Sequence, residues 1–542
     1  SAFDKALQDG IIVTEAPVAS GSFSGAAVDG AIAAVNAYKG NTDGQYEVLI
    51  YESVAIGYGG SHSNNPWLLE MPDPVTRATW DNYICMSYKT AKEKFESELT
   101  LHNQVDHKKR VLKVTVNNKE VELPVVVLPG MHNDVIAIAV GYGRSKNVGR
   151  AAADLGKNVY HFGQYTGTTF LNYNVGTVAL TSAFYPVAIT QTHHSYEGRE
   201  IIQEFTLDEF KKDPNFLLNK RKKELGHYTT LHWEGHHDEH GEDKSSAGEQ
   251  ALKHDKDFEK NGTLYPVHEK HGIKWGMSID LNACTGCGAC VIACQAENNI
   301  SVVGKDRVLV AQEMSWIRID RYFSGNPDDP DTIQTIYQPM LCQHCDNAPC
   351  ENVCPVSATN HSDEGLNQMA YNRCIGTKYC ANNCPYKVRH FNWFDWNGAD
   401  SFADNLYQDG RRDDINDDIT RMVLNPDVTV RSRGVMEKCS FCVQRLQAGK
   451  LAAKMEGRPL KDTDVQVACQ KACAGDCITF GNVNDTESKI YKERYEENSE
   501  RLFYVLEYLH VLPNISYLSK IRNTDAIVAK DKEQDVFQVK NL

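Results

Sequence analysis

The cysteines constrain this chain more than any other feature. Sixteen of its 17 cysteines lie between Cys284 and Cys477, and 15 of these form four groups with short, repeated spacings. The first group reads Cys-x2-Cys-x2-Cys-x3-Cys, and the fourth is split in two by 26 residues. In order, the groups are Cys284, Cys287, Cys290 and Cys294; Cys342, Cys345, Cys350 and Cys354; Cys374, Cys380 and Cys384; and Cys439, Cys442, Cys469 and Cys473.

This spacing is that of bacterial ferredoxins. Three cysteines on a tight loop reach three irons of a cubane, and a fourth, three residues on, points to a neighbouring cluster. Structural zinc is the alternative. Two features favour iron: Pro355 and Pro385 each follow a terminal cysteine, as in ferredoxins, and zinc ribbons do not usually carry the fourth cysteine. We therefore predict iron-sulfur clusters that transfer single electrons along a row.

The first 204 residues look different, with one cysteine and several strand patterns. Residues 45–55 form an apolar strand candidate before the glycines of a turn. Residues 65–83 are too rich in proline for a long helix. Residues 110–116 and 120–128 predict a hairpin. Residues 129–144 predict a turn followed by a buried strand or short helix. This part of the sequence therefore reads as α/β and β structure.

Two less apolar segments flank the cysteine-rich part. Residues 205–272 predict a charged, His-rich connector, in which Lys220–Lys223 is one exposed helix face and His232–His240 a solvated tract rather than a metal site. The cysteine-rich domain then spans 273–485, with a strand over Trp316–Tyr322. Residues 486–542 predict a helical tail, with a helix over Arg501–Pro513.

The quoted motifs carry a resemblance to known families. Residues 65–83, the hairpin and the 129–144 segment resemble the C-terminal part of molybdopterin oxidoreductases, including a dinucleotide-binding-type β-barrel. Residues 273–485 resemble the iron-sulfur subunits of polysulfide, dimethyl sulfoxide and nitrate reductases. Together they resemble the fused molybdopterin-like and iron-sulfur subunit of bacterial alternative complex III. The resemblance implies a multidomain fold: an α/β and β-barrel part over 1–204, then an α+β ferredoxin-like domain with four clusters.

The resemblance also implies how the cysteines pair, with the first group joining the fourth and the second joining the third. The implied [4Fe-4S] ligands are Cys284, Cys287, Cys290 and Cys473; Cys439, Cys442, Cys469 and Cys294; and Cys342, Cys345, Cys350 and Cys384. The last site has Cys374, Cys380 and Cys354, with Thr377 where the pattern wants a cysteine. A hydroxyl is a poor ligand for iron of this kind, so we expect a [3Fe-4S] cluster there. The alternative is a cubane with a non-cysteine ligand. Cys85 and Cys477 remain as small buried thiols.

The implied function is that of an electron-transfer subunit in a hetero-oligomeric respiratory complex. It would carry electrons from a quinol site in an integral membrane partner toward a c-type cytochrome subunit, at the periplasmic face of a bacterial inner membrane, without molybdenum. One alternative is the iron-sulfur portion of a molybdopterin reductase, which passes electrons from quinol to molybdenum. Another is a structural module without redox activity.

Composition limits the remaining possibilities. The net charge of −15 argues against a nucleic-acid partner, and no apolar run is long enough to span a membrane. No nucleophile elbow, phosphate loop or haem-attachment motif is present, so we predict no substrate-turnover site in this chain. The sequence starts at Ser1 without a methionine, which suggests a processed or partial chain.

Overall fold

The computed structural model describes residues 25–37, 45–95, 108–149, 151–165, 170–194, 196, 199, 201–229, 246–261, 268, 270–326, 328–393 and 422–523. The chain divides into two units, residues 1–45 and 46–542. The first contributes one described helix, α2 (Gly25–Ala37). Everything that follows concerns the second unit. Among the described residues, no helix is both long and apolar enough to cross a membrane.

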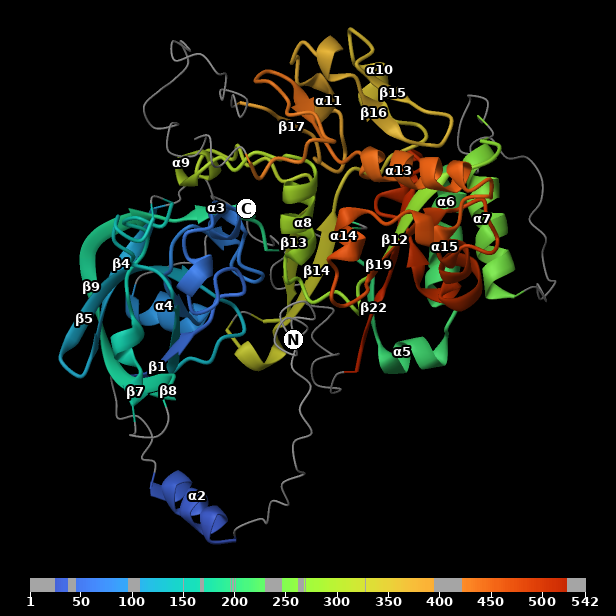
Figure 1. The fold of residues 1–542 in the computed structure, drawn as a ribbon. Helices are drawn as coiled ribbons and strands as arrows, with labels where there is room; N and C mark the ends of the chain where they lie inside the picture. The colour runs from blue at the N-terminus through green and yellow to red at the C-terminus, as the bar shows by residue number, and fades with distance from the viewer. Residues whose placement is uncertain are drawn as a thin grey trace, which may run out of the picture. The chain divides into compact units, whose positions relative to one another are not determined.

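A closed six-stranded barrel occupies the N-terminal part of the second unit (Figure 1). Its strands follow the order β1-β6-β3-β5-β4-β9. Their bounds are β1 Gln45–Tyr51, β3 Ile84–Met86, β4 Lys108–Val116, β5 Lys119–Val127, β6 Val135–Ala139 and β9 Tyr173–Pro186. Alternate residues of β4, Leu112, Val114 and Val116, are buried inside the barrel, as the period of two of a half-buried strand requires.

The barrel confirms three expectations about local structure. Asn117 and Asn118 both have positive φ, 49° and 62°, and they join β4 to β5 in the two-residue hairpin that the sequence predicted. Residues 65–83 form no long helix: they contain the short helix α3 (Pro66–Glu70), which Asn65 caps, and the two-residue strand β2 (Ala78–Thr79). The segment after Pro129 becomes strand β6, which pairs in parallel with β1. A barrel is therefore present, while its likeness to a molybdopterin oxidoreductase remains a prediction.

The cysteine-rich part is built from small sheets and short helices. Its largest sheet has the order β19-β12-β21-β20, with bounds β12 Trp275–Asp280, β19 Ile478–Asn482, β20 Leu502–Phe503 and β21 Ile515–Leu518. Three two-stranded sheets accompany it: β13 (Arg318–Ser324) with β14 (Gln334–Met340), β15 (Thr359–His361) with β16 (Asn367–Met369), and β17 (His390–Phe391) with β18 (Met436–Glu437). The helices are α8 (Ala289–Glu297), α9 (Lys305–Val308), α10 (Pro349–Asn352), α11 (Tyr379–Asn382), α13 (Val443–Met455), α14 (Ala468–Lys471) and α15 (Lys489–Lys492).

The predicted tail helix is wrong. Residues 501–513 contain β20 and a 3-10 turn at Glu507–Leu509, and β21 follows. Leu502 and Phe503 pair with Leu518 and Tyr517 of β21, which itself lies beside β12. An apolar run of this length fits a helix or a buried strand equally well. Here the open edge of the sheet decides, because it supplies backbone partners that an isolated segment lacks.

The connector is more ordered than its composition suggested. It contains β11 (Glu204–Thr206), α5 (Leu207–Lys212), α6 (Phe216–Thr229) and α7 (Ala247–Asn261), and α6 contacts α7 (Figure 1). The exposed basic face predicted for Lys220–Lys223 is wrong at Arg221, whose side chain is 5% exposed and forms ion pairs with Asp255 and Glu507. The His232–His240 tract lies outside the described residues.

Buried polar contacts join the barrel part to the cysteine-rich part. The Arg77 guanidinium donates to the carbonyl of Ile319 in β13. The Gln191 amide both donates to the Arg321 carbonyl, at 2.6 Å, and accepts from the Arg321 N–H, at 2.7 Å. Lys305 forms a 2.6 Å ion pair with Asp81, whose side chain is fully buried. Breaking any of these contacts would leave a buried polar group unpaired, so they favour a fixed arrangement over a hinge.

Glu70 contributes to the same interface and makes it sensitive to pH. Its carboxylate accepts hydrogen bonds from the N–H groups of Val303, at 3.0 Å, and Gly304, at 2.8 Å. Burial is the largest influence on this carboxyl and raises its pKa from 4.5 to about 7, although the two backbone donors act in the opposite direction. The unfolded chain therefore ionises before the folded protein as pH rises.

We expect Glu70→Gln to remove a pH-dependent loss of stability. Below about pH 4.5 both states hold the proton, and between about pH 4.5 and 7 wild-type stability falls by about 3 kcal/mol, at about 1.4 kcal/mol per pKa unit. The variant should lack this fall, so its advantage over wild type should grow from pH 4.5 to 8 in chemical unfolding of the iron-loaded protein. Glu120→Gln, at a half-exposed carboxylate on β5, should run parallel to wild type. If the stability of Glu70→Gln instead changes with pH as that of wild type does, the raised pKa assigned to Glu70 is refuted.

Candidate iron-sulfur centres

Tight loops and short helices position the cysteines. Gly288 precedes α8 with φ of 82°, Lys378 precedes α11 with φ of 62°, and Cys442 precedes α13 with φ of 49°. A left-handed residue at the start of a helix reverses the chain sharply, so that thiols a few residues apart can face one point. None of the 17 cysteines, all of which the structure describes, forms a disulfide bond.

Three of the four predicted ligand groups are reflected in the electrostatics of their thiols. Burial raises the pKa of Cys290, followed by the charges of Cys284, Cys287 and Cys473. Burial likewise raises the pKa of Cys294, followed by Cys439, Cys442 and Cys469. The pKa of Cys345 is raised by burial and then by Cys342, Cys384 and Cys350. Each of these thiols thus has as its strongest charged neighbours the three cysteines with which it was predicted to share a cluster.

The fourth group lies on two helices that contact each other. Cys354 follows α10 and Cys380 lies in α11, and Asn383 donates to the Pro349 carbonyl at 2.7 Å across them. Figure 1 shows α10, α11, β15 and β16 together in one part of the molecule. Cys374 is tied to β18, since its Sγ accepts from the Met436 N–H at 3.4 Å. Thr377 is exposed on the loop between Cys374 and Cys380.

The donor set suits iron-sulfur clusters. Several buried thiolates cannot ionise side by side unless a positive charge compensates them, and a metal core supplies that charge. Backbone N–H groups point at the sulfurs, as at Cys439, which accepts from Phe441 at 3.4 Å, and at Cys442, which accepts from Ala468 at 3.5 Å. Such donors stabilise the reduced state of a cluster. A bound cluster supplies one-electron redox chemistry, and the chain supplies thiolates, hydrogen bonds and a dry surrounding.

The polar side chains near the second and third cysteine groups mostly brace loops. The residues in question are Gln343, His344, Asn347, Lys378, Asn382, Asn383, Lys387 and Arg389. Gln343 donates to the Leu341 carbonyl, and Lys378 lies over the rings of Trp393 and Phe391 at 3.6 and 4.2 Å. Arg389 is the exception among these. Burial lowers its pKa, but the neighbouring thiolates, Cys350 first, outweigh burial and hold it above its ordinary value.

Two amide side chains contact sulfurs that the sequence pattern did not connect to them. Asn298 donates to Cys294 Sγ at 3.6 Å and to Cys442 Sγ at 3.7 Å. Asn367 donates to Cys350 Sγ at 3.7 Å. Asn298 stands four residues after a terminal cysteine, a signal that was available in the sequence. Asn367 reaches its cysteine only through the pairing of β15 with β16.

The two remaining cysteines have different surroundings. Cys85 lies in barrel strand β3, with its side chain buried outside the barrel interior, 4.0 Å from the Tyr51 hydroxyl and far in sequence from the other thiols. Burial raises its pKa to about 12, so it behaves as the inert buried thiol that was expected. Cys477 is also buried, but its Sγ lies 3.3 Å from Cys473 Sγ.

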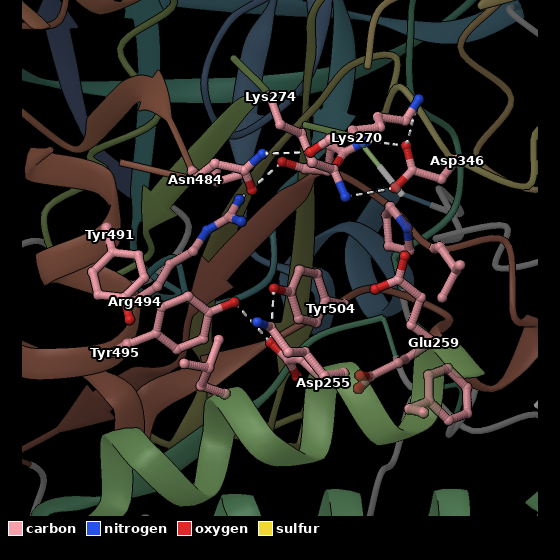
Figure 2. A pocket seen from close by; sticks show the side chains of 18 of the residues that line it. Asp255, Glu259, Lys270, Lys274, Asp346, Asn484, Tyr491, Arg494, Tyr495 and Tyr504 are labelled. Carbon is pink, nitrogen blue, oxygen red and sulfur yellow. Dashed lines mark hydrogen bonds and ion pairs between the residues drawn. The ribbon is translucent and has the colours of Figure 1, made fainter. Parts of the chain in front are cut away.

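A polar pocket of about 390 Å³ lies between α7 and the cysteine-rich part (Figure 2). On one side Lys274 and Lys270 approach Asp346, at 2.7 and 3.6 Å. Burial raises the pKa of Asp346, but these two cations outweigh it and keep the pKa below its ordinary value. Asp346 directly follows Cys345, so the ion pairs tie the segment before β12 to a cysteine loop.

The opposite wall of the pocket contains a group with metal-ligand chemistry. One ligand atom each of His254, Asp255 and Glu507 lies within 4.8 Å of the others. Arg221 already bridges the two carboxylates, at 2.7 and 2.8 Å. Its positive charge occupies the place that a cation would take, so we interpret this group as a structural clamp.

Comparisons with known proteins agree with these motifs. Two models described as 4Fe-4S dicluster domains match residues 283–358 and 333–397. The chain is 39% identical over 255 residues to the iron-sulfur cluster-binding subunit of menaquinone reductase from Nitratidesulfovibrio vulgaris, a match that covers 46% of this chain and 89% of the relative.

Two relatives of lower sequence identity are also named as subunits of reductases. A putative dimethyl sulfoxide reductase iron-sulfur subunit of Halobacterium salinarum is 32% identical, over 42% of this chain and 73% of the relative. One of the chains of polysulfide reductase from Wolinella succinogenes is 29% identical, over 40% of this chain and 82% of the relative.

Motifs, fold and relatives together define a ferredoxin-type protein with 4Fe-4S domains. This protein belongs to the family of iron-sulfur subunits of oxidoreductase complexes. An electron-transfer role in a hetero-oligomeric oxidoreductase complex is thereby established in outline.

Proposed function

We propose that this chain relays electrons between a quinone site in a membrane partner and a redox site in a second partner subunit. The observation that carries the proposal is the clustering into four groups of 15 cysteines, 11 of which are buried in one apolar core. The similarity to a menaquinone reductase subunit supports a quinone at one end of the relay. The similarity to dimethyl sulfoxide and polysulfide reductase subunits supports a reductase site at the other end, and we propose that this site contains molybdenum.

A second candidate is the relay of an alternative complex III-like quinol oxidoreductase, which passes electrons to a c-type cytochrome without molybdenum. The observation that favours it is the barrel in the same chain, joined to the cysteine-rich part through Arg77, Gln191 and Glu70. The relatives cover less than half of this chain, and the 4Fe-4S models match residues 283–358 and 333–397, which all follow the barrel. Molybdenum and pterin analysis of the purified complex separates the candidates: stoichiometric molybdenum supports the reductase, and its absence supports the cytochrome route.

We further propose three [4Fe-4S] clusters on the groups of Cys290, Cys294 and Cys345, and a [3Fe-4S] cluster on Cys354, Cys374 and Cys380. Three cubanes and one trinuclear cluster hold about 15 irons per chain. The exposed hydroxyl of Thr377 stands at the position of the missing ligand. A trinuclear cluster has a higher potential than a typical cubane, which suits exchange with a quinol.

Electron paramagnetic resonance and iron counting on the purified complex test this assignment. Wild type should show a [3Fe-4S] signal in the oxidised state and about 15 irons per chain. Thr377→Cys should gain about one iron and lose that signal, because a fourth thiolate completes the cubane. Thr377→Ser, which adds no thiolate, is the matched control and should behave as wild type. About 16 irons and no oxidised signal in wild type would instead mean four cubanes, and zinc without iron would refute the relay.

A further inference from the structure

Cys477 is a fifth thiol at the first predicted centre. Its Sγ lies 3.3 Å from Cys473 Sγ, and its side chain lies near that of Cys284. The side chain is buried, with the residue 5% exposed, whereas Cys473 is half-buried. One thiol thus lies close to two of the four cysteines that were predicted to hold a single cluster.

The backbone holds Cys477 firmly in this place. Its N–H donates to Cys473 Sγ at 3.4 Å, and its carbonyl accepts from the Asp280 N–H at 2.8 Å. Cys477 immediately precedes β19, which pairs with β12, and β12 leads directly into the loop of Cys284. The thiols of Cys477 and Cys284 are therefore held near each other by the pairing of β19 with β12, and not by the rotamer of the Cys477 side chain alone.

The other motifs show what normally occupies this position. Four residues after the terminal cysteines Cys294, Cys354 and Cys384 stand Asn298, Ala358 and Val388. Ala358 donates its N–H to Cys354 Sγ at 3.2 Å, just as Cys477 does to Cys473. The position is therefore a recurring one beside a ligand sulfur. Alanine and valine have no side-chain atom that could bind iron, whereas the fourth motif has a thiol at this position.

We propose that Cys477 is an interchangeable ligand of the first centre, able to replace Cys473 on the same iron. In the exchange the iron–sulfur bond to Cys473 breaks while one to Cys477 forms. The Cys477 proton passes to Cys473 across the 3.3 Å contact, and no electron is transferred. A thiolate replaces a thiolate, so the charge of the site is unchanged. This inference rests on the cluster assignment proposed above.

The exchange has a clear advantage for the centre. Cys473 is the more exposed of the two thiols, and exposed cysteines are more readily oxidised or alkylated. Loss of one thiolate ordinarily converts a cubane to a trinuclear cluster or destroys it. A buried second thiol beside it would keep the fourth iron bound.

The test replaces terminal cysteines in the intact protein within its complex and counts iron. Cys473→Ala should retain the wild-type iron content and cluster signals, because Cys477 takes over. Cys384→Ala is the matched control, since Val388 stands where Cys477 does, and it should lose at least one iron per chain. Cys473→Ala/Cys477→Ala should lose iron in the same way, and Cys477→Ala alone should retain it.

Three results would overturn the proposal. Iron loss in Cys473→Ala equal to that in Cys384→Ala would show that Cys477 cannot ligate. Iron loss in Cys477→Ala alone would make it the fixed ligand rather than the alternative one. If Cys473→Ala fails to fold, Cys473→Ser decides by Mössbauer spectroscopy, where an oxygen-ligated iron site, rather than an all-thiolate one, contradicts the exchange. Wild type without iron would refute the proposed function itself, so the two failures are distinguishable.

Discussion

Removal of iron should unfold the cysteine-rich part of this protein and leave the barrel folded. Most of the predicted ligands are buried in a single apolar core with Trp275, Phe441 and Tyr517. Without metal, this core would have to bury many thiols around cavities as large as clusters, and binding energy that otherwise stabilises the fold would be lost. The barrel interior, from Val48 to Phe162, is a separate core that contains no cysteine.

Thiol alkylation under anaerobic chelation measures this outcome residue by residue. The 16 cysteines from Cys284 to Cys477 should become reactive as iron leaves, while Cys85, which is 3% exposed in barrel strand β3, should stay protected until the barrel itself unfolds. Chelator with added iron in excess is the control and should leave all thiols protected. Protection of these cysteines after complete loss of iron would show that the fold does not depend on clusters.

Arg221→Met should lower the free energy of unfolding by about 3–5 kcal/mol, the usual cost of breaking a buried ion pair from one side. Arg221 donates two hydrogen bonds to the Glu507 carboxylate, at 2.9 and 2.8 Å, and one to Asp255 at 2.7 Å. The side chains are 5%, 11% and 15% exposed, so water compensates little when the cation is removed. Helix α6 would then no longer be clamped to α7 and to the tail.

Matched variants separate charge from packing at this clamp. Lys220→Met lies next to Arg221 on the same helix, is 29% exposed, and should cost less than about 1 kcal/mol. Adding Asp255→Asn and Glu507→Gln to Arg221→Met should restore part of the loss, because the uncompensated charges are removed. Equal effects of Arg221→Met and Lys220→Met in thermal and chemical unfolding would show that the ion pairs contribute little.

Features that depend on a few neighbouring residues were predictable from the sequence. The hairpin at Asn117 and Asn118 depends on two residues that tolerate positive φ, and both adopt it. The four cysteine groups depend on backbone reach over three to five residues, and relatives and family models support 4Fe-4S domains there. The position of Thr377 is likewise read directly from the spacing. Cluster type and ligand sets remain predictions.

Features that depend on distant partners were not predictable. Arg221 looked like part of a solvated basic run, yet its partners stand 34 and 286 residues away. Residues 501–513 suited a helix, but the open edge of β21 paired with residues 502–503 as a strand.

Cys477 fits no motif, and only the pairing of β19 with β12 brings it to Cys284. The sequence by itself determined where metal ligands can gather, because ligand spacing is a local property of the backbone. The tertiary structure alone decided which charges are buried and which extra thiol joins a ligand group, because burial and long-range pairing arise from contacts between segments that are remote in the chain.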